Sequence, residues 1–189
     1  MGEERGAHPA GPSDEALMQD YQAGDLSAFD VLYVRYEKRV FSYLLRQIGD
    51  PEAAADLFQE TFLRLHRSRE DYDPNRSFLA WIFTIAGNLV RTEFKRRSSR
   101  LDERAETDVE HIGGGTPTDA RAEQAEMADR IRAALDALPQ EQRQVILLNK
   151  CEGLSYREIA EITRSTAAAV KQMAYRALLG LRNRLKDVV

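Results

Sequence analysis

Four polar side chains near the C-terminus have the types and the spacing needed to read DNA. Lysine and glutamine can reach base edges in the major groove, and arginine can bind a guanine or a phosphate. On a helix they would share one exposed side, opposite an apolar stripe. The four are Lys171, Gln172, Tyr175 and Arg176, and the stripe consists of Val170, Ala174, Ala177, Leu181 and Leu185. The alternative interpretation is an ordinary solvated face on a small helical bundle.

The residues before this helix would position it. Ser155 and Glu158 match the Ser-x-x-Glu capping box, which predicts the start of a first, short helix. Polar residues rich in capping types follow it, and Ser165 or Thr166 then begins the second helix. Ala160 is small where two such helices would cross closely. This layout predicts a helix-turn-helix.

Charge is distributed unevenly along the chain. The 189 residues have a formal net charge of −4, but residues 139–186 contain nine Lys and Arg against four Asp and Glu. Residues 98–138 have the opposite balance, with five basic and ten acidic residues. A basic segment within an acidic chain is the electrostatic footprint expected of a polyanion-binding domain.

The composition argues against several other classes of protein. The single cysteine cannot form an intrachain disulfide, and three scattered histidines predict no zinc site or other cofactor. No Ser/His/Asp set, metal-ligand spacing or phosphate-binding loop supports an enzyme. No apolar run approaches the roughly 18 residues of a membrane span, and the N-terminus has no signal-peptide core. We therefore expect a cytoplasmic protein without membrane insertion.

Helical periodicity extends through the rest of the chain, and no strand pattern occurs. Expected helices start at Ser13, at Ser27 and after Asp50, where proline follows at the first helical position. Two more are expected at residues 78–97 and 119–138, the second with Ile131 facing inward. The sequence thus predicts an all-α protein.

Two helical domains joined by a flexible linker are expected. The N-terminal domain spans residues 14–97 after a loose tail at residues 1–13, and the C-terminal domain spans residues 119–189. Residues 98–118 contain three consecutive glycines and no apolar periodicity, which is typical of a linker. At ~3.3 Å per residue this segment would reach roughly 70 Å, about two turns of DNA at ~34 Å per turn.

Three motifs together carry a resemblance to a known family. Residues 56–64 read DLFQETFLR, residues 77–88 read SFLAWIFTIAGN, and residues 137–160 contain ALP followed by EGLSYREIA. In this order and spacing they resemble the bacterial RNA polymerase sigma factors of the sigma-70 family, extracytoplasmic-function (ECF) group. The resemblance covers nearly everything from residue 14 to residue 185. It implies a region 2-like bundle and a region 4-like helix-turn-helix domain.

The resemblance also implies a role in transcription initiation, with no enzymatic activity. The N-terminal domain would bind the polymerase clamp and the promoter −10 element, and the C-terminal domain would read the −35 element. The implied partners are core RNA polymerase, promoter DNA and an anti-sigma factor, which the family usually has.

Residues are assigned by position in the family motifs. The clamp-binding residues would be Asp56, Gln59, Glu60 and Phe62. The −10 element would be read and melted by Asp73, Asn75, Arg76, Asn88, Arg91, Lys95 and Arg96. The −35 element would be read by Lys171, Gln172, Tyr175 and Arg176.

Some of these features have a second interpretation. Asn88 could bond inside the bundle, and Trp81, which could stack on an unpaired base, has the spacing of a core residue. The turn departs from the family, with Arg164-Ser165 where a glycine and an apolar residue are common. Alanines follow where a Gly-Thr pair is common, so −35 readout could rest on fewer side chains.

A free-standing helix-turn-helix regulator is the alternative function. Such a repressor usually needs a dimer and palindromic half-sites one turn apart, and the sequence contains no evident dimerisation segment. Co-purification with core polymerase would distinguish the two.

Overall fold

The structure, a computed structural model, describes residues 11–103 and 119–186, with residues 100–103 and 119–125 as backbone alone. Within these ranges every regular element is a helix or helical turn, which confirms the predicted fold class. The first half contains α1 (Asp14–Gln22), α2 (Leu26–Ile48), α3 (Pro51–Arg67), the 3-10 turn η1 (Arg69–Asp71) and α4 (Phe78–Glu103). The second half contains α5 (Asp119–Asp136), α6 (Gln140–Ile146), the π-helical turn η2 (Leu147–Cys151), α7 (Tyr156–Thr163) and α8 (Ala167–Arg184).

Local capping sets where the first helices begin. Ser13 accepts a hydrogen bond from the backbone of Ala16 at 3.1 Å, and Asp50 accepts one from Glu52 at 3.0 Å, so both predicted caps are confirmed. The cap of α2 is Asp25 and not Ser27, because the carboxylate accepts from both the backbone and the hydroxyl of Ser27. A carboxylate is favoured at the positive end of the helix dipole.

α4 is longer than predicted. The predicted end at Arg97 is wrong, because the helix continues to Glu103. Ser99 does not interrupt it, since its hydroxyl donates to the carbonyl of Lys95 at 3.1 Å, a bond that accommodates serine inside a helix. The predicted linker therefore starts within α4, and its remainder at residues 104–118 lies outside the described residues.

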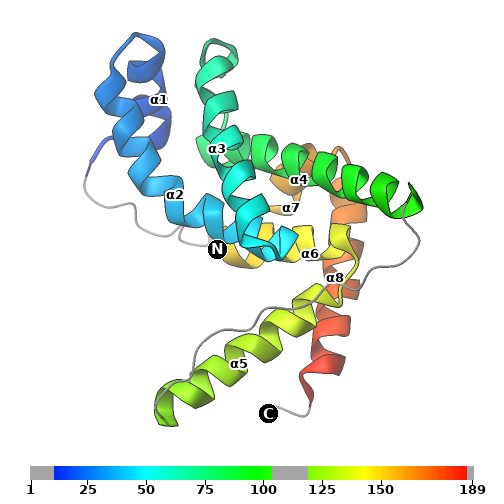
Figure 1. Ribbon diagram of the computed structural model, residues 1–189. Coiled ribbons are helices and arrows are strands. Elements are labelled where there is room, and N and C mark those ends of the chain that lie inside the picture. The colour runs from blue at the N-terminus through cyan, green and yellow to red at the C-terminus, as the bar shows by residue number, and fades with distance from the viewer. Residues whose placement is uncertain (1–10, 104–118, 187–189) are drawn as a thin grey trace, which may run out of the picture.

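α4 lies between α1–α3 on one side and α6–α8 on the other (Figure 1). Its Phe83, Ala86 and Val90 are fully buried and belong to one apolar cluster that continues into both halves of the chain. That cluster contains Tyr36, Tyr43 and Leu44 from α2, and Leu148, Ile159 and Val170 from the second half. The two predicted domains are thus packed against each other, which the sequence did not predict.

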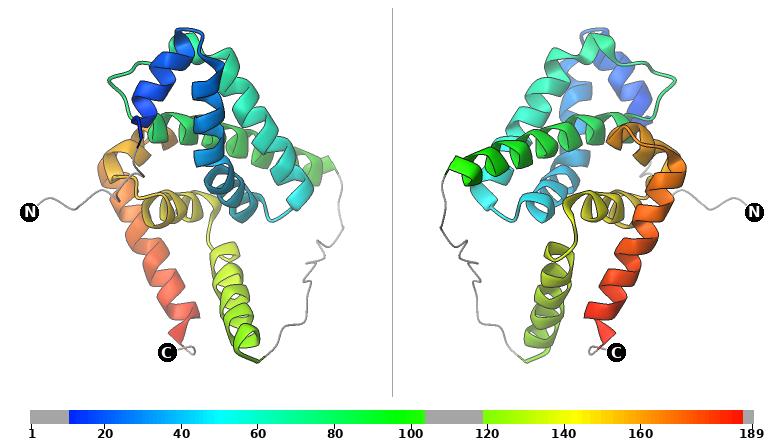
Figure 2. Two further views of the ribbon diagram at one scale, coloured as in Figure 1. Left: turned by 90° about the vertical axis from the view of Figure 1, so that its left-hand side faces the viewer. Right: turned by 90° about the vertical axis from the view of Figure 1, so that its right-hand side faces the viewer.

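α5 is the least buried helix for which side chains are described. Figure 2 shows α5 and the C-terminal end of α8 extending away from the other helices. Ile131 is 43% exposed, so its predicted inward position is wrong. Only the end of this segment, at Ala134 and Leu138, is buried. The periodicity of a helix shows which side is apolar, but only a neighbouring helix can bury that side.

Polar contacts also join the two halves. The amide of Gln144 donates to the hydroxyl of Tyr43 at 3.2 Å in the buried interior. The guanidinium of Arg39 donates to the carboxylate of Glu152 at 2.9 Å. Burial raises the pKa of the Glu152 carboxyl, and the charge of Arg39 opposes this rise. The carboxylate therefore depends on Arg39 for its stabilisation.

Candidate nucleic-acid interface

The helix-turn-helix forms where the capping pattern predicts it. The hydroxyl of Ser155 accepts from the backbone of Glu158 at 3.3 Å, and the Glu158 carboxylate accepts from the backbone of Ser155 at 2.8 Å. Thr166, one of the two expected caps, starts α8 by accepting from Ala169 at 3.1 Å. These bonds orient α8 relative to α7.

The turn between the two helices is built without glycine. Arg164 caps the end of α7 at φ 55° and ψ 44°, the left-handed conformation. Its N–H donates to the carbonyls of Ala160 and Glu161, and the N–H of Ser165 also donates to Ala160 at 2.9 Å, so these carbonyls at the helix end are paired. The departure from the family pattern therefore leaves the turn intact at a conformational cost.

The outer side of α8 is open to solvent. Lys171, Gln172, Tyr175 and Arg176 are all exposed, Tyr175 by 68%. None of the four side chains makes a hydrogen bond or ion pair with any part of the chain that the structure describes. The stripe residues Val170, Ala174 and Ala177 are buried on the opposite side, as expected. Four polar side chains on a rigid helix are thus available to a groove of DNA.

The loop between η1 and α4 presents a second group of polar side chains. Asp73 accepts from both the backbone and the side-chain amide of Asn75 at 3.0 Å, and these bonds lower the pKa of the Asp73 carboxyl. The buried Tyr72 anchors the loop by donating to the carbonyl of Arg76 at 2.6 Å. Its ring also packs against Trp81 at 4.9 Å between centroids, so Trp81 is a half-buried packing residue here.

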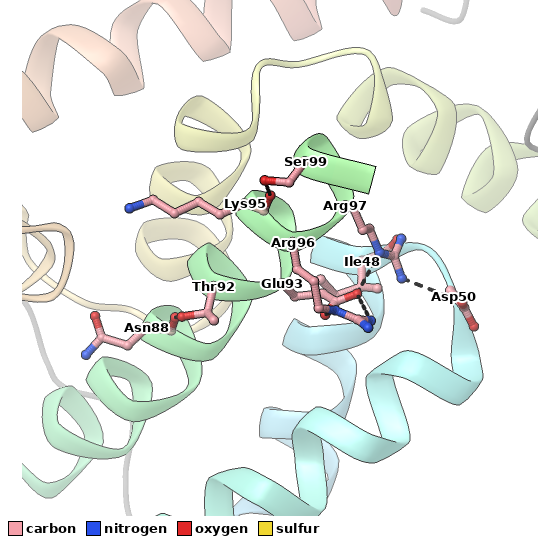
Figure 3. Close-up of polar contacts among 9 residues, drawn as sticks. All are labelled: Ile48, Asp50, Asn88, Thr92, Glu93, Lys95, Arg96, Arg97 and Ser99. Atoms are coloured by element: carbon pink, nitrogen blue, oxygen red, sulfur yellow. Dashed lines mark hydrogen bonds and ion pairs between the residues drawn. The ribbon is translucent and has the colours of Figure 1, made fainter. Parts of the chain in front are cut away.

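The basic end of α4 is divided between two sides of the helix. Figure 3 shows Asn88 and Lys95 on one side, and Glu93, Arg96 and Arg97 on the other. Arg96 makes two bonds of 2.8 Å with the Glu93 carboxylate, whose pKa they lower. Arg97 pairs with the same carboxylate at 2.9 Å. Arg96 is thus held away from the side that carries Asn88 and Lys95.

The side chain of Asn88 is used partly inside the protein and is partly available at the surface. Its side-chain oxygen accepts from Arg91 at 3.0 Å, so part of the amide is used inside the protein. It also lines a shallow pocket between α3 and α4, together with Arg64, Arg67, Ser68 and Ile85. The two arginines were not among the predicted DNA-binding residues. Their i, i+3 spacing near the end of α3 could have indicated a basic site.

The predicted clamp-binding residues do not all lie on one side of α3. Asp56 and Gln59 are exposed, and Glu60 is half-buried and paired with Arg64 at 2.7 Å. Phe62 is only 7% exposed, and its ring packs on Tyr33 at 4.8 Å between centroids.

Leu63, the next residue, is 48% exposed and was missed. It follows Gln59 by four residues, which places both on the same side of α3.

Two further kinds of site can be assessed in the described ranges. No helix there is long and apolar enough to cross a membrane. No group of three or more His, Cys, Asp or Glu there is arranged to hold a metal ion.

The exposed polar side of α8 in one half, and the polar loop and the partly basic α4 in the other, are the surfaces expected of a two-part helical DNA-binding protein. Residues 32–100 match Sigma-70 region 2, and residues 128–181 match Sigma-70, region 4. The chain belongs to the sigma-70 family of RNA polymerase sigma factors.

Individual relatives are similar along most of the chain. RNA polymerase sigma factor CarQ of Myxococcus xanthus is 32% identical, over 90% of this chain and 97% of CarQ. ECF RNA polymerase sigma factor BldN of Streptomyces coelicolor is 34% identical, over 95% of this chain and 70% of BldN. The structure of CnrH in complex with the cytosolic domain of CnrY has a TM-score of 0.67 at 26% identity, covering 92% of this chain and 97% of CnrH. These similarities support membership of the ECF group.

Proposed function

We propose that this ECF sigma factor divides promoter recognition between its two halves. The side of α8 with Lys171, Gln172, Tyr175 and Arg176 would read the −35 element. The observation that carries this proposal is that all four side chains are exposed and lack partners in the described part of the chain. Because lysine, glutamine and arginine are suited to base edges in the major groove, this side is suited to direct readout.

The first half would read and open the −10 element. Asn75 and Arg76 are exposed at the loop, and Lys95 is exposed on α4. The pocket with Asn88 and Arg67 adds positive charge beside an amide, a combination suited to a nucleotide, whereas Arg64 in the same pocket is paired with Glu60. We assign Arg96 a weaker role than Lys95, because its guanidinium is already paired with Glu93.

The exposed side of α3 would bind the polymerase clamp. We include Leu63 with Asp56, Gln59 and Glu60, and we replace Phe62, because a buried ring cannot reach a partner. An anti-sigma factor is a further proposed partner, since a sigma factor of similar fold, RpoE of Bartonella quintana, has been solved with the anti-sigma factor NepR.

In this proposal the chain itself performs no catalysis. It directs core polymerase to the promoter, and the polymerase carries out RNA synthesis in the cytoplasm.

Transcription by mutant holoenzymes tests whether the two halves read different promoter elements. The promoters are altered in one element at a time. Arg176→Ala should cost roughly 1–3 kcal/mol at a directly contacted base, and the loss should depend on the upstream sequence alone. The loss caused by Asn75→Ala should depend on the downstream element, and this variant should also slow strand opening. Lys95→Ala should weaken every promoter alike and reduce the salt dependence of binding. Identical promoter profiles for the Arg176 and Asn75 variants would contradict the proposal.

A further inference from the structure

Arg91 holds the side-chain amide of Asn88 in one orientation. Its Nη1 donates to Oδ1 of Asn88 at 3.0 Å, across the i, i+3 spacing that makes two side chains neighbours on a helix. A guanidinium carries five N–H donors and no acceptor, so the amide can face it only with its oxygen. The NH2 group of Asn88 therefore points away from Arg91.

Other bonds of the two residues leave this contact undisturbed. Nη2 of Arg91 donates to the backbone carbonyl of Ile162 at 3.5 Å, so a different nitrogen serves each partner. The hydroxyl of Thr92 donates to the backbone carbonyl of Asn88 at 3.0 Å and does not compete for the side chain. A hydrogen bond from a charged donor is roughly twice as strong as a neutral one. Rotation of the amide would replace this bond by a repulsive contact between two donors.

The NH2 group of Asn88 is available at the pocket between α3 and α4. It has no partner in the described ranges, and the pocket has a volume of about 290 Å³ beside the apolar Ile85. Arg67 lines the same pocket, makes no hydrogen bond or ion pair in those ranges, and also offers donors only. Arg64 is already paired within α3. The two nitrogen groups left for a ligand are thus both donors.

This orientation limits what Asn88 can recognise on DNA. An asparagine that pairs with adenine uses its oxygen and its NH2 group together, but here the oxygen is directed at Arg91. The NH2 group alone needs an acceptor. Thymine O4 and guanine O6 are acceptors at the edge where adenine and cytosine carry amines. A phosphate oxygen is the other acceptor that a DNA strand offers.

We infer that Arg91 is a positioning residue for the −10 element. It fixes Asn88 as a hydrogen-bond donor, and Asn88 contacts an acceptor atom of the separated strand. This inference rests on the proposed assignment of Asn88 to the −10 element. It gives Arg91 a role through Asn88, in place of a direct contact with DNA.

Asn88→Asp tests the donor, because it keeps an oxygen for Arg91 and replaces the NH2 group by a second oxygen. Holoenzyme is incubated with promoter fragments whose downstream element is randomised, and the bound fragments are sequenced. The wild type should favour T or G over A or C at one position by about tenfold, the scale of one hydrogen bond. Asn88→Asp should reverse the preference at that position, since a carboxylate accepts from an amine.

Thr92→Asp is the matched control for the added charge. Thr92 is exposed four residues later on the same side of α4, and its substitution introduces the same carboxylate. A charge effect alone should weaken binding to all fragments alike and leave the base preference unchanged.

Arg91→Ala and Arg91→Lys test the positioning. Without Arg91 the amide can rotate and present either atom, so Arg91→Ala should reduce the preference for T or G to about twofold. A lysine ammonium also carries donors only, so Arg91→Lys should retain the preference. A uniform loss of affinity in Arg91→Ala, with the base preference and the linkage dependence described next both unchanged, would overturn the positioning role.

Fragments with one neutral methylphosphonate linkage at a time identify a phosphate acceptor. If no position favours T or G, the wild type and Arg91→Lys should lose affinity at one linkage. Asn88→Asp should be insensitive to that linkage, and Arg91→Ala should be less sensitive than the wild type. A wild-type profile for Asn88→Asp at every base and every linkage would overturn the inference.

Asn75→Ala in the same selection separates this inference from the assignment on which it rests. If Asn75→Ala loses downstream selectivity while Asn88→Asp matches the wild type, the −10 assignment stands and the inference fails. If neither variant changes downstream selectivity, the −10 assignment fails and the inference fails with it.

Discussion

Arg164 occupies the one left-handed backbone position that is not glycine in the described ranges. A side chain in this conformation costs roughly 1–2 kcal/mol, because Cβ approaches the following carbonyl. The caps on both sides leave the chain little freedom there, since the N–H of Arg164 is bonded to the end of α7 and Thr166 caps the start of α8. The turn therefore retains a local strain that a glycine would remove.

Arg164→Gly should raise the free energy of unfolding by about 1 kcal/mol, because the strain is lost while both caps remain. Urea denaturation followed by circular dichroism measures this. Arg164→Ala is the control, since it removes the charge and keeps Cβ, and its stability should stay near the wild type. Equal gains for both substitutions would show that charge, and not backbone conformation, determines the effect.

At the scale of one element, α3 has one side that packs in the core and another side that faces solvent. Its inner side packs Phe62 against aromatic rings of α2, including Tyr33. Its outer side presents Gln59 and the exposed Leu63 to solvent. An exposed leucine beside an amide is a suitable anchor for a partner, because its burial on binding contributes roughly 1.5–3 kcal/mol.

Leu63→Ala should weaken binding to core polymerase by about tenfold and change the stability of the free chain by only about 0.5 kcal/mol. Fluorescence anisotropy with labelled core enzyme measures the affinity. Leu26→Ala is the matched control, because Leu26 is 68% exposed and lies at the start of α2. If the two leucine variants lose affinity equally, the surface on α3 is not specific.

The helix boundaries could be predicted wherever they depend on a few neighbouring residues. Asp50 and the pair Ser155 and Glu158 were predicted correctly, since a cap is a local hydrogen bond. The end of α4 was predicted too early, because a helix can continue past its last apolar residue, as it does here through Ser99 to Glu103. The motif assigned Phe62 by position, but position in a motif does not say which side of a helix faces the core.

At the scale of the whole molecule, the packing of the two halves could not be predicted. In the sequence, Gly87 indicates only a position of low helix propensity. Arg39 and Glu152 are 113 residues apart in the chain. Their pairing becomes visible only once both halves are placed in three dimensions. The proposed −35 side of α8 could be predicted, because it depends on the period of one helix. The contact of Arg91 with the backbone carbonyl of Ile162 could not, because it depends on tertiary packing.

Exchanging the charges of Arg39 and Glu152 tests whether this pair holds the two halves together. Arg39→Glu places a second carboxylate beside the buried Glu152, and like charges should drive the halves apart and enlarge the radius of gyration. Combining it with Glu152→Arg restores opposite charges and should restore the compact form. Scattering on the two free proteins provides the comparison. A double variant as expanded as Arg39→Glu would mean that the pair does not hold the halves together.

The contact between Trp81 and Tyr72 makes the chain its own optical reporter. Trp81 is the sole tryptophan in the sequence, and its ring is half-buried against the tyrosine that anchors the Asp73 loop. Intrinsic tryptophan emission from the free protein therefore comes from one place, directly beside the proposed −10 site. Any rearrangement of that loop should change the wavelength or the intensity of the emission. Rapid mixing of the unlabelled protein with DNA could follow loop rearrangement in real time, with no dye attached to the surface under study.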